Sequence, residues 1–79
     1  MHKNTLLENI DKIHTTEMGI ERIQRNLRID EDPVAYCISK IKKDDSKVSK
    51  KGKNYYIEID GCTITINSSS FTIITAHKI

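Results

Sequence analysis

The chain has 79 residues, of which 37% are hydrophobic and 30% charged, and its formal net charge is +2 at pH 7. A single domain over residues 1–79 removes only about 60% of its unfolded surface from water, which excludes a large core and a deep substrate cavity. No apolar run approaches the roughly 20 residues of a membrane-spanning helix, and no signal-peptide apolar region is present, so we expect a cytoplasmic protein without a membrane segment.

Two amphipathic helices are predicted in the N-terminal part of the chain. Thr5 and Glu8 have the spacing of a capping box, and apolar residues at helical spacing predict a first helix over about residues 5–13. Either threonine of the HTTE segment can cap a second helix over about residues 16–28, which has one apolar stripe and a charged face.

A third helix and a basic segment follow. Asp32 is a suitable cap and Pro33 suits the first helical position, so apolar residues at i, i+3, i+4 and i+7 predict a helix over about residues 33–43. The positive charge is concentrated nearby, because residues 40–53 carry seven lysines and two aspartates. We expect residues 44–52 to form a mobile basic loop.

The C-terminal part of the chain changes to the period of a β-strand. Alternating residues predict strands over about residues 54–60 and 62–67, and Asp60-Gly61 between them is preferred in a two-residue type I′ hairpin. A third strand is predicted over residues 71–78. The expected fold class is therefore α+β, with three N-terminal helices followed by a three-stranded antiparallel β-meander.

The last strand is apolar on both faces, so its facing depends on the length of the serine turn before it. With a three-residue turn, Ile74 and Ala76 face the core while His77 lies on the polar face. With a two-residue turn, Phe71, Ile73 and His77 turn toward the helices. The sequence leaves both arrangements open.

The two cysteines, Cys37 and Cys62, have no CxxC spacing. In a small cytoplasmic domain we expect two buried, reduced thiols, with a disulfide as the alternative. Too few ligands at suitable spacing remain to complete a zinc site, so we expect no metal and no cofactor.

Two groups of residues are candidates for function. His77 can act as a general acid or base, and Lys78 beside it can neutralise a phosphate, although an ordinary packing role for the histidine is the alternative. The KKGKNYY segment combines lysines that can follow phosphates with tyrosines on which a base can stack. The candidate nucleic-acid-binding residues are Lys50, Lys51, Lys53, Tyr56, Arg22 and Arg25. A solvated charged surface is the alternative for both basic segments.

The segments HTTEMGIERIQRNL, KKGKNYYIEIDGCTITIN and SFTIITAHK resemble a family of small, mostly bacterial proteins, catalogued as the domain of unknown function numbered thirty-seven eighty-one. The resemblance covers nearly the whole chain, and the family name implies no activity. This chain has Tyr55-Tyr56 where a tryptophan–tyrosine pair is usual. The resemblance implies that the family's pattern includes His14, Thr16, Glu17, Gly19, Arg22, Asn26, Lys51, Gly52, Lys53, Asn54, Asn67 and His77.

A more distant likeness is to the ribonuclease superfold of barnase, the RelE toxins and the tRNA-cutting colicins. That likeness implies an open sheet face that cuts RNA with a base, an acid and a cation and without a metal. The candidate catalytic residues are His77, His14, Glu58, Lys78 and Tyr56. We therefore expect RNA binding or metal-independent RNA cleavage on the exposed sheet face. The alternative is a non-catalytic protein-interaction module that binds a protein partner or forms a homodimer.

Overall fold

The protein is an α+β domain with one four-stranded sheet, described by a computed structural model over residues 2–78. Its elements are α1 (His2–Glu8), the 3₁₀ helix η1 (Ile10–Lys12), α2 (Glu17–Leu27), α3 (Pro33–Ile41), β1 (Lys47–Lys51), β2 (Asn54–Ile59), β3 (Cys62–Asn67) and β4 (Ile73–Lys78). The strands lie in the order β1-β2-β3-β4 and each neighbouring pair is antiparallel. The predicted fold class and the three helices are confirmed, but the sheet has four strands and not three.

The unexpected strand, β1, lies inside the segment 44–52 that was predicted to be a loop. It pairs with β2 through a two-residue turn in which Gly52 has a φ of 62° and Lys53 is outside the left-handed region. A glycine at the first turn position is typical of a type II′ hairpin. Only Val48 of the five β1 residues is apolar, so backbone pairing with β2, rather than apolar alternation, defines this strand.

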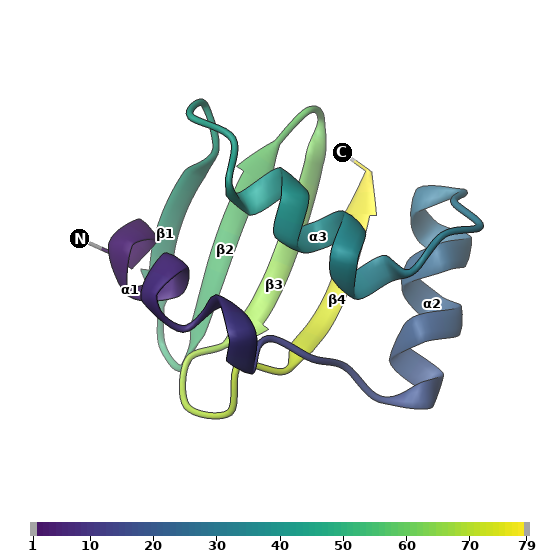
Figure 1. Ribbon diagram of the computed structural model, residues 1–79, viewed down its shortest axis with the longest axis horizontal. Coiled ribbons are helices and arrows are strands. Elements are labelled where there is room, and N and C mark those ends of the chain that lie inside the picture. The colour runs from purple at the N-terminus through teal and green to yellow at the C-terminus, as the bar shows by residue number, and fades with distance from the viewer. Residues whose placement is uncertain (1, 79) are drawn as a thin grey trace.

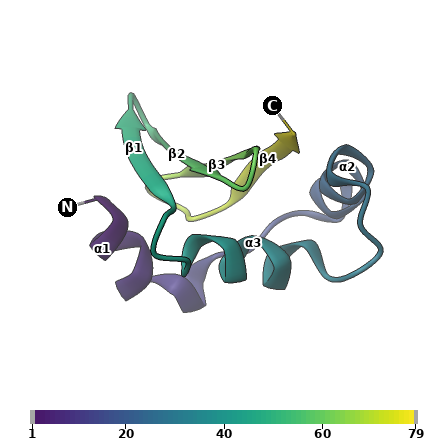
Figure 2. The ribbon, with the colours of Figure 1, turned by 90° about the horizontal axis from the view of Figure 1, so that it is seen from above.

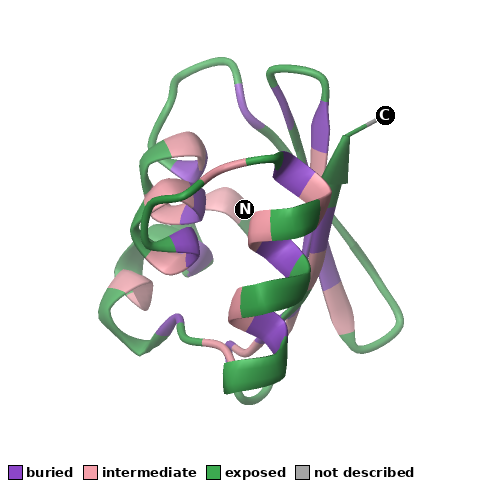
Figure 3. Cartoon of the chain, turned by 90° about the vertical axis from the view of Figure 1, so that its right-hand side faces the viewer, coloured by how far each residue is buried: buried purple, intermediate pink, exposed green. Residues whose placement is uncertain are grey.

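The helices and the sheet form two layers (Figures 1 and 2). α1 and α3 cover one face of the sheet, α2 lies along β4, and no helix within residues 2–78 covers the opposite face. Figure 3 shows that buried positions recur along the helices on the side next to the sheet. The largest fully buried side chains are Leu6, Ile23, Ile41, Ile57, Ile64, Ile66, Ile73, Pro33 and Cys37.

The helix starts agree with the sequence for α2 and α3 but not for α1. The Thr16 hydroxyl accepts a hydrogen bond from the Gly19 N–H at 3.0 Å, and the Asp32 carboxylate accepts one from the Val34 N–H at 2.9 Å. Thr5, by contrast, lies inside α1 and does not begin it. The first N–H groups of a helix can be hydrated by water when they are exposed, so α1 needs no capping box at that position.

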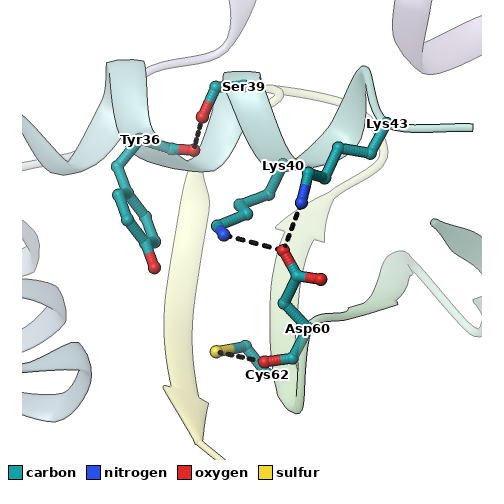
Figure 4. A network of polar contacts seen from close by, with 6 residues as sticks. All are labelled: Tyr36, Ser39, Lys40, Lys43, Asp60 and Cys62. Carbon is teal, nitrogen blue, oxygen red and sulfur yellow. Dashed lines mark hydrogen bonds and ion pairs between the residues drawn. The ribbon is translucent and has the colours of Figure 1, made fainter. Parts of the chain in front are cut away.

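The hairpin between β2 and β3 has the predicted turn. Asp60 and Gly61 have φ values of 50° and 73°, and Ile59 is paired with Cys62. The Asp60 carboxylate accepts hydrogen bonds from Lys40 at 2.7 Å and Lys43 at 2.8 Å (Figure 4). The turn is therefore attached to the C-terminal end of α3.

A β-bulge at Ile74 decides the facing of β4, because the register with β3 shifts there by one residue. Ile73 before the bulge and Ala76 after it are both buried, while His77 is exposed. Phe71 is also buried. Each of the two expected facings is therefore correct for one part of the strand, and neither is correct for all of it.

The two thiols agree with the prediction of reduced, buried cysteines. Cys37 on α3 and Cys62 on β3 form no disulfide, and both are buried. Burial, with a smaller contribution from Cys62, raises the pKa of the Cys37 thiol to about 12. Cys37 is therefore a packing residue and an unreactive thiol near neutral pH.

Candidate functional site

The open face of the sheet carries three rows of polar side chains that cross the strands. Residues directly opposite each other in a ladder point to the same face, and the alternate positions on β2 and β3 are buried against the helices. The rows are Lys47–Glu58–Thr63–His77, Ser49–Tyr56–Thr65–Thr75 and Lys51–Asn54–Asn67.

Three of the five candidate catalytic residues share this open face. Glu58 and His77 are both exposed, and each lies directly opposite Thr63 of the strand between them. Two strand spacings of about 4.8 Å separate their backbones by roughly 10 Å. Tyr56 lies two residues before Glu58 on the same face of β2 and is partly exposed.

The other two candidate catalytic residues lie elsewhere. Lys78 is paired with the buried Cys62, so it points to the helix side of the sheet. His14 forms a bridge with Thr72, just before β4, whereas His77 is near the far end of that strand. Five residues at about 3.3 Å each separate the two histidines by roughly 16 Å along β4. The structure therefore does not bring His14 to His77.

His14 instead belongs to a hydrogen-bonded network that the sequence analysis missed. Its Nδ1 lies 2.8 Å from the Lys12 carbonyl oxygen, which can only accept, so Nδ1 carries the hydrogen. Its Nε2 lies 3.1 Å from the Thr72 hydroxyl, which is 2.8 Å from the Ser70 hydroxyl. Ser70 also lies 3.3 Å from Asn67 Oδ1. The network orders the β3–β4 loop, and an asparagine before serines is a turn signal that could have indicated it.

The predicted nucleic-acid-binding lysines divide between the two faces. Lys51 lies on the open face and Lys53 in the turn after it, but Lys50 points to the helix side, where its ammonium is 5.9 Å from the centre of the Tyr55 ring. Lys47, which the sequence analysis did not select, lies on the open face opposite Glu58. It was missed because β1 was predicted to be a loop.

The lysines of the β1 hairpin have no carboxylate partner. Between residues 2 and 78, the ion pairs are those of Asp60 with Lys40 on α3 and with Lys43 just after it. Lys47, although opposite Glu58, and Lys51 therefore form no ion pair within the described chain and can attract an anionic ligand.

Arg22 and Arg25 are far from these lysines. Both are exposed on α2, which lies along β4, whereas the lysines lie on β1 at the other edge of the sheet (Figure 1). One extended ligand on the open face would have to cross the whole sheet and turn around its edge to contact both groups.

The described residues also limit the kind of site. Residues 2–78 form no enclosed pocket, and in this range no group of three histidine, cysteine or acidic side chains could hold a metal ion. The helices within it are too short and too polar to cross a membrane. A ligand of this face would have to lie on an open surface.

Comparison with known protein families places the chain in a family. Residues 7–77 match the family described as Protein of unknown function (DUF3781). No curated protein matches the chain, and no solved structure matches it. The family resemblance seen in the sequence is confirmed, while the more distant likeness to the ribonuclease superfold gains no support.

Proposed function

Because this chain belongs to the family of proteins of unknown function DUF3781, whose description names no activity, we propose a function from the open face of its sheet. The proposed function is the binding of single-stranded RNA across that face. In this arrangement the phosphates contact the lysines of β1 and a base stacks on Tyr56.

The position of the lysines supports the phosphate contacts. Lys47 and Lys51 lie on the same face of β1, four residues or about 13 Å apart, and Lys53 continues the basic surface into the turn. These charges follow one edge of the sheet and have no carboxylate partner in residues 2–78. Lysines arranged in this way can neutralise successive phosphates of an extended strand.

The position of Tyr56 supports the base contact. Tyr56 is opposite Ser49, which lies midway between Lys47 and Lys51 on the neighbouring strand. When the β1 lysines bind the RNA phosphates, a base that points from this backbone toward the middle of the sheet would reach the Tyr56 ring. Stacking on an aromatic side chain suits any unpaired base. Residues 2–78 form no pocket, and an open face of this kind fits an extended strand better than a small molecule, which needs a concave site.

The same face supports metal-independent RNA cleavage as a second candidate function. A phosphodiester over Thr63 would have Glu58 on one side and His77 on the other. One side chain would remove the proton of the attacking 2′-hydroxyl and the other would protonate the leaving 5′-oxygen, while Lys47 beside Glu58 would offset the charge of the phosphorane.

The binding proposal is tested with a short fluorescent single-stranded RNA at increasing salt, without divalent cations. The wild type is compared with the double variant Lys47→Ala/Lys51→Ala. The matched control, Arg22→Ala/Arg25→Ala, removes the same charge from α2. Each lost phosphate contact should reduce the magnitude of the slope of log Kobs against log salt by about 0.7. The slope should therefore be smaller by about 1.4 for the lysine variant and unchanged for the control. Equal losses in both variants, or wild-type binding without salt dependence, would contradict the proposal.

A further inference from the structure

The outer edge of β1 presents backbone groups that form no backbone hydrogen bond with the described residues, although α1 packs beside this strand. The two-residue turn after Lys51 makes Lys51 and Asn54 a hydrogen-bonded pair. Along the β1–β2 ladder, hydrogen-bonded pairs then alternate with non-hydrogen-bonded pairs. By this alternation, Val48 and Lys50 direct their N–H and C=O groups away from β2. Between residues 2 and 78 no hydrogen bond outside the ladder involves these groups.

The start of the opposite edge of the sheet is paired with another segment of the chain. The His14 N–H donates to the Phe71 carbonyl at 3.2 Å, and the Ile73 N–H donates to the His14 carbonyl at 2.7 Å. The Thr15 hydroxyl donates to the Ile73 carbonyl at 2.9 Å. The segment before α2 therefore pairs with the start of β4, while no described segment forms backbone hydrogen bonds with the outer edge of β1.

The side chains of β1 determine which kind of strand could fill this edge. Lys47 and Lys51 point to the open face, Lys50 points to the helix side with the half-buried Val48, and β1 has no acidic residue. A second copy of β1 would place lysines beside lysines, which is the usual way in which a protein prevents pairing between its own edges. An acidic strand would meet the opposite charge.

We propose that β1 binds an extended acidic peptide as a fifth strand of the sheet. The peptide backbone pairs with Val48 and Lys50, and its acidic side chains lie beside Lys47 and Lys51 on the open face. On the helix side an apolar peptide residue extends the surface of Val48. The partner is thus a protein segment in which acidic and apolar residues alternate.

This inference goes beyond RNA binding and does not depend on it. The peptide site uses the backbone edge of β1, whereas RNA on the open face uses Tyr56 and lysine side chains only. Both ligands contact Lys47 and Lys51, so substitution of those lysines would weaken both and cannot separate them. The tests therefore address the backbone groups.

The first test measures amide hydrogen exchange of the whole protein with a peptide in which glutamate alternates with valine. In an antiparallel fifth strand the peptide valines lie opposite Val48 and Lys50, so the Val48 and Lys50 N–H groups should become protected. A peptide of alternating glutamate and proline has the same charge but lacks the donors at those positions, so it should bind much more weakly. Equal binding of both peptides, or no protection at Val48 and Lys50, would overturn the proposal. Protection of the same two groups by a single-stranded RNA would overturn it as well.

The second test changes one backbone donor of the protein. Lys50→Pro and Lys50→Ala remove the same charge, but only the proline removes the outward N–H, and it leaves the ladder to β2 intact because that N–H is not part of it. The proline variant should bind the glutamate–valine peptide about fivefold more weakly than the alanine variant, as expected for one lost backbone hydrogen bond. Equal affinities would overturn the proposal. The exchange measurement on the wild type decides the matter if the proline variant does not fold.

Discussion

Glu58 and His77 point to the same side of the sheet from two strands that do not touch, each directly opposite Thr63. Two separate features produce this relationship. The type I′ hairpin sets the register of Glu58, and the bulge at Ile74 turns His77 outward although Ile73 faces the core. Without the extra residue of the bulge, a strand with Ile73 buried would direct His77 toward the helices.

A glycine inside α2 gives the first prediction. Alanine normally stabilises a helix by about 1 kcal/mol relative to glycine, but a Cβ at Gly19 would overlap the Thr15 hydroxyl, which is hydrogen-bonded to the Ile73 carbonyl. We expect Gly19→Ala to lower the free energy of unfolding by about 1 kcal/mol or more in urea denaturation. Met18→Ala at the neighbouring, exposed position is the control and should have little effect.

A double-mutant cycle identifies the cause of that loss. In a Thr15→Ala background the hydroxyl is absent, so the loss caused by Gly19→Ala should become smaller. The same loss in both backgrounds would show that overlap with the Thr15 hydroxyl is not the reason for the glycine.

The ion pairs of Asp60 predict a pH dependence of stability. Hydrogen bonds from Lys40 and then Lys43 hold the pKa of Asp60 below its ordinary value of 3.8. A carboxyl group whose pKa is lower in the folded than in the unfolded state stabilises the fold fully at pH values above its unfolded-state pKa. That stabilisation is lost as the pH falls through its folded-state pKa. We expect wild type to melt higher than Asp60→Asn between pH 5 and pH 7 by a constant difference, which should shrink below about pH 3.8.

Salt and a second aspartate control this experiment. High salt should reduce the difference, because the Asp60 carboxylate is exposed and its ion pairs are screened. Asp45→Asn removes the same charge from an exposed position without an ion pair in residues 2–78 and should melt like the wild type. An equal effect of both substitutions would assign the change to net charge and not to the Lys40 and Lys43 contacts.

The parts of the fold that could be predicted are those with two agreeing local signals. The β2–β3 hairpin has both an alternating pattern and the Asp60-Gly61 turn, and it was predicted with the correct register. β1 has a Gly-Lys turn but only Val48 as an apolar residue, so its pattern resembles a solvated loop. The sequence around Ile74 gives no signal for a bulge, because Ile73 and Ile74 are equally apolar and either could have been the buried one.

The candidate site was predictable to a similar extent. The open face of β2 follows from the alternating pattern, because Tyr56 and Glu58 are two residues apart on the same strand. The position of His14 depends on a contact with Thr72, which is 58 residues away in the sequence. Such pairings between distant segments are decided by tertiary packing, and no pattern within the first helices indicates them.

The stacking role of Tyr56 gives the third prediction. Tyr56→Leu removes the aromatic ring and should weaken the binding of single-stranded RNA by about 1–3 kcal/mol, while Tyr56→Phe keeps the ring and should bind like the wild type. Neither substitution removes a charge, so the salt slope should not change in either variant. Thermal unfolding of both variants checks that the partly buried side chain has not affected the fold. Equal affinity of the leucine variant and the wild type would exclude this ring as the stacking surface.

The fourth prediction separates RNA cleavage from RNA binding at the Glu58–His77 pair. If the pair transfers protons, His77→Gln and Glu58→Gln should each reduce the cleavage of single-stranded RNA without divalent metal by about 10²–10⁴-fold. Both side chains are exposed, so RNA binding and the melting temperature should stay close to those of the wild type.

His14→Gln is the matched control for these two variants, because it removes a histidine from the other end of the sheet. His14 holds the β3–β4 loop through Lys12 and Thr72, so this variant should keep full cleavage activity and melt at a lower temperature. The opposite pattern, in which His14→Gln abolishes cleavage and His77→Gln does not, would move the reaction away from the Glu58–His77 pair. If the wild type cuts no RNA and His77→Gln lowers the melting temperature, the cleavage proposal is wrong and His77 has a structural role. A proton carrier on an open surface would instead contribute to the reaction and little to stability.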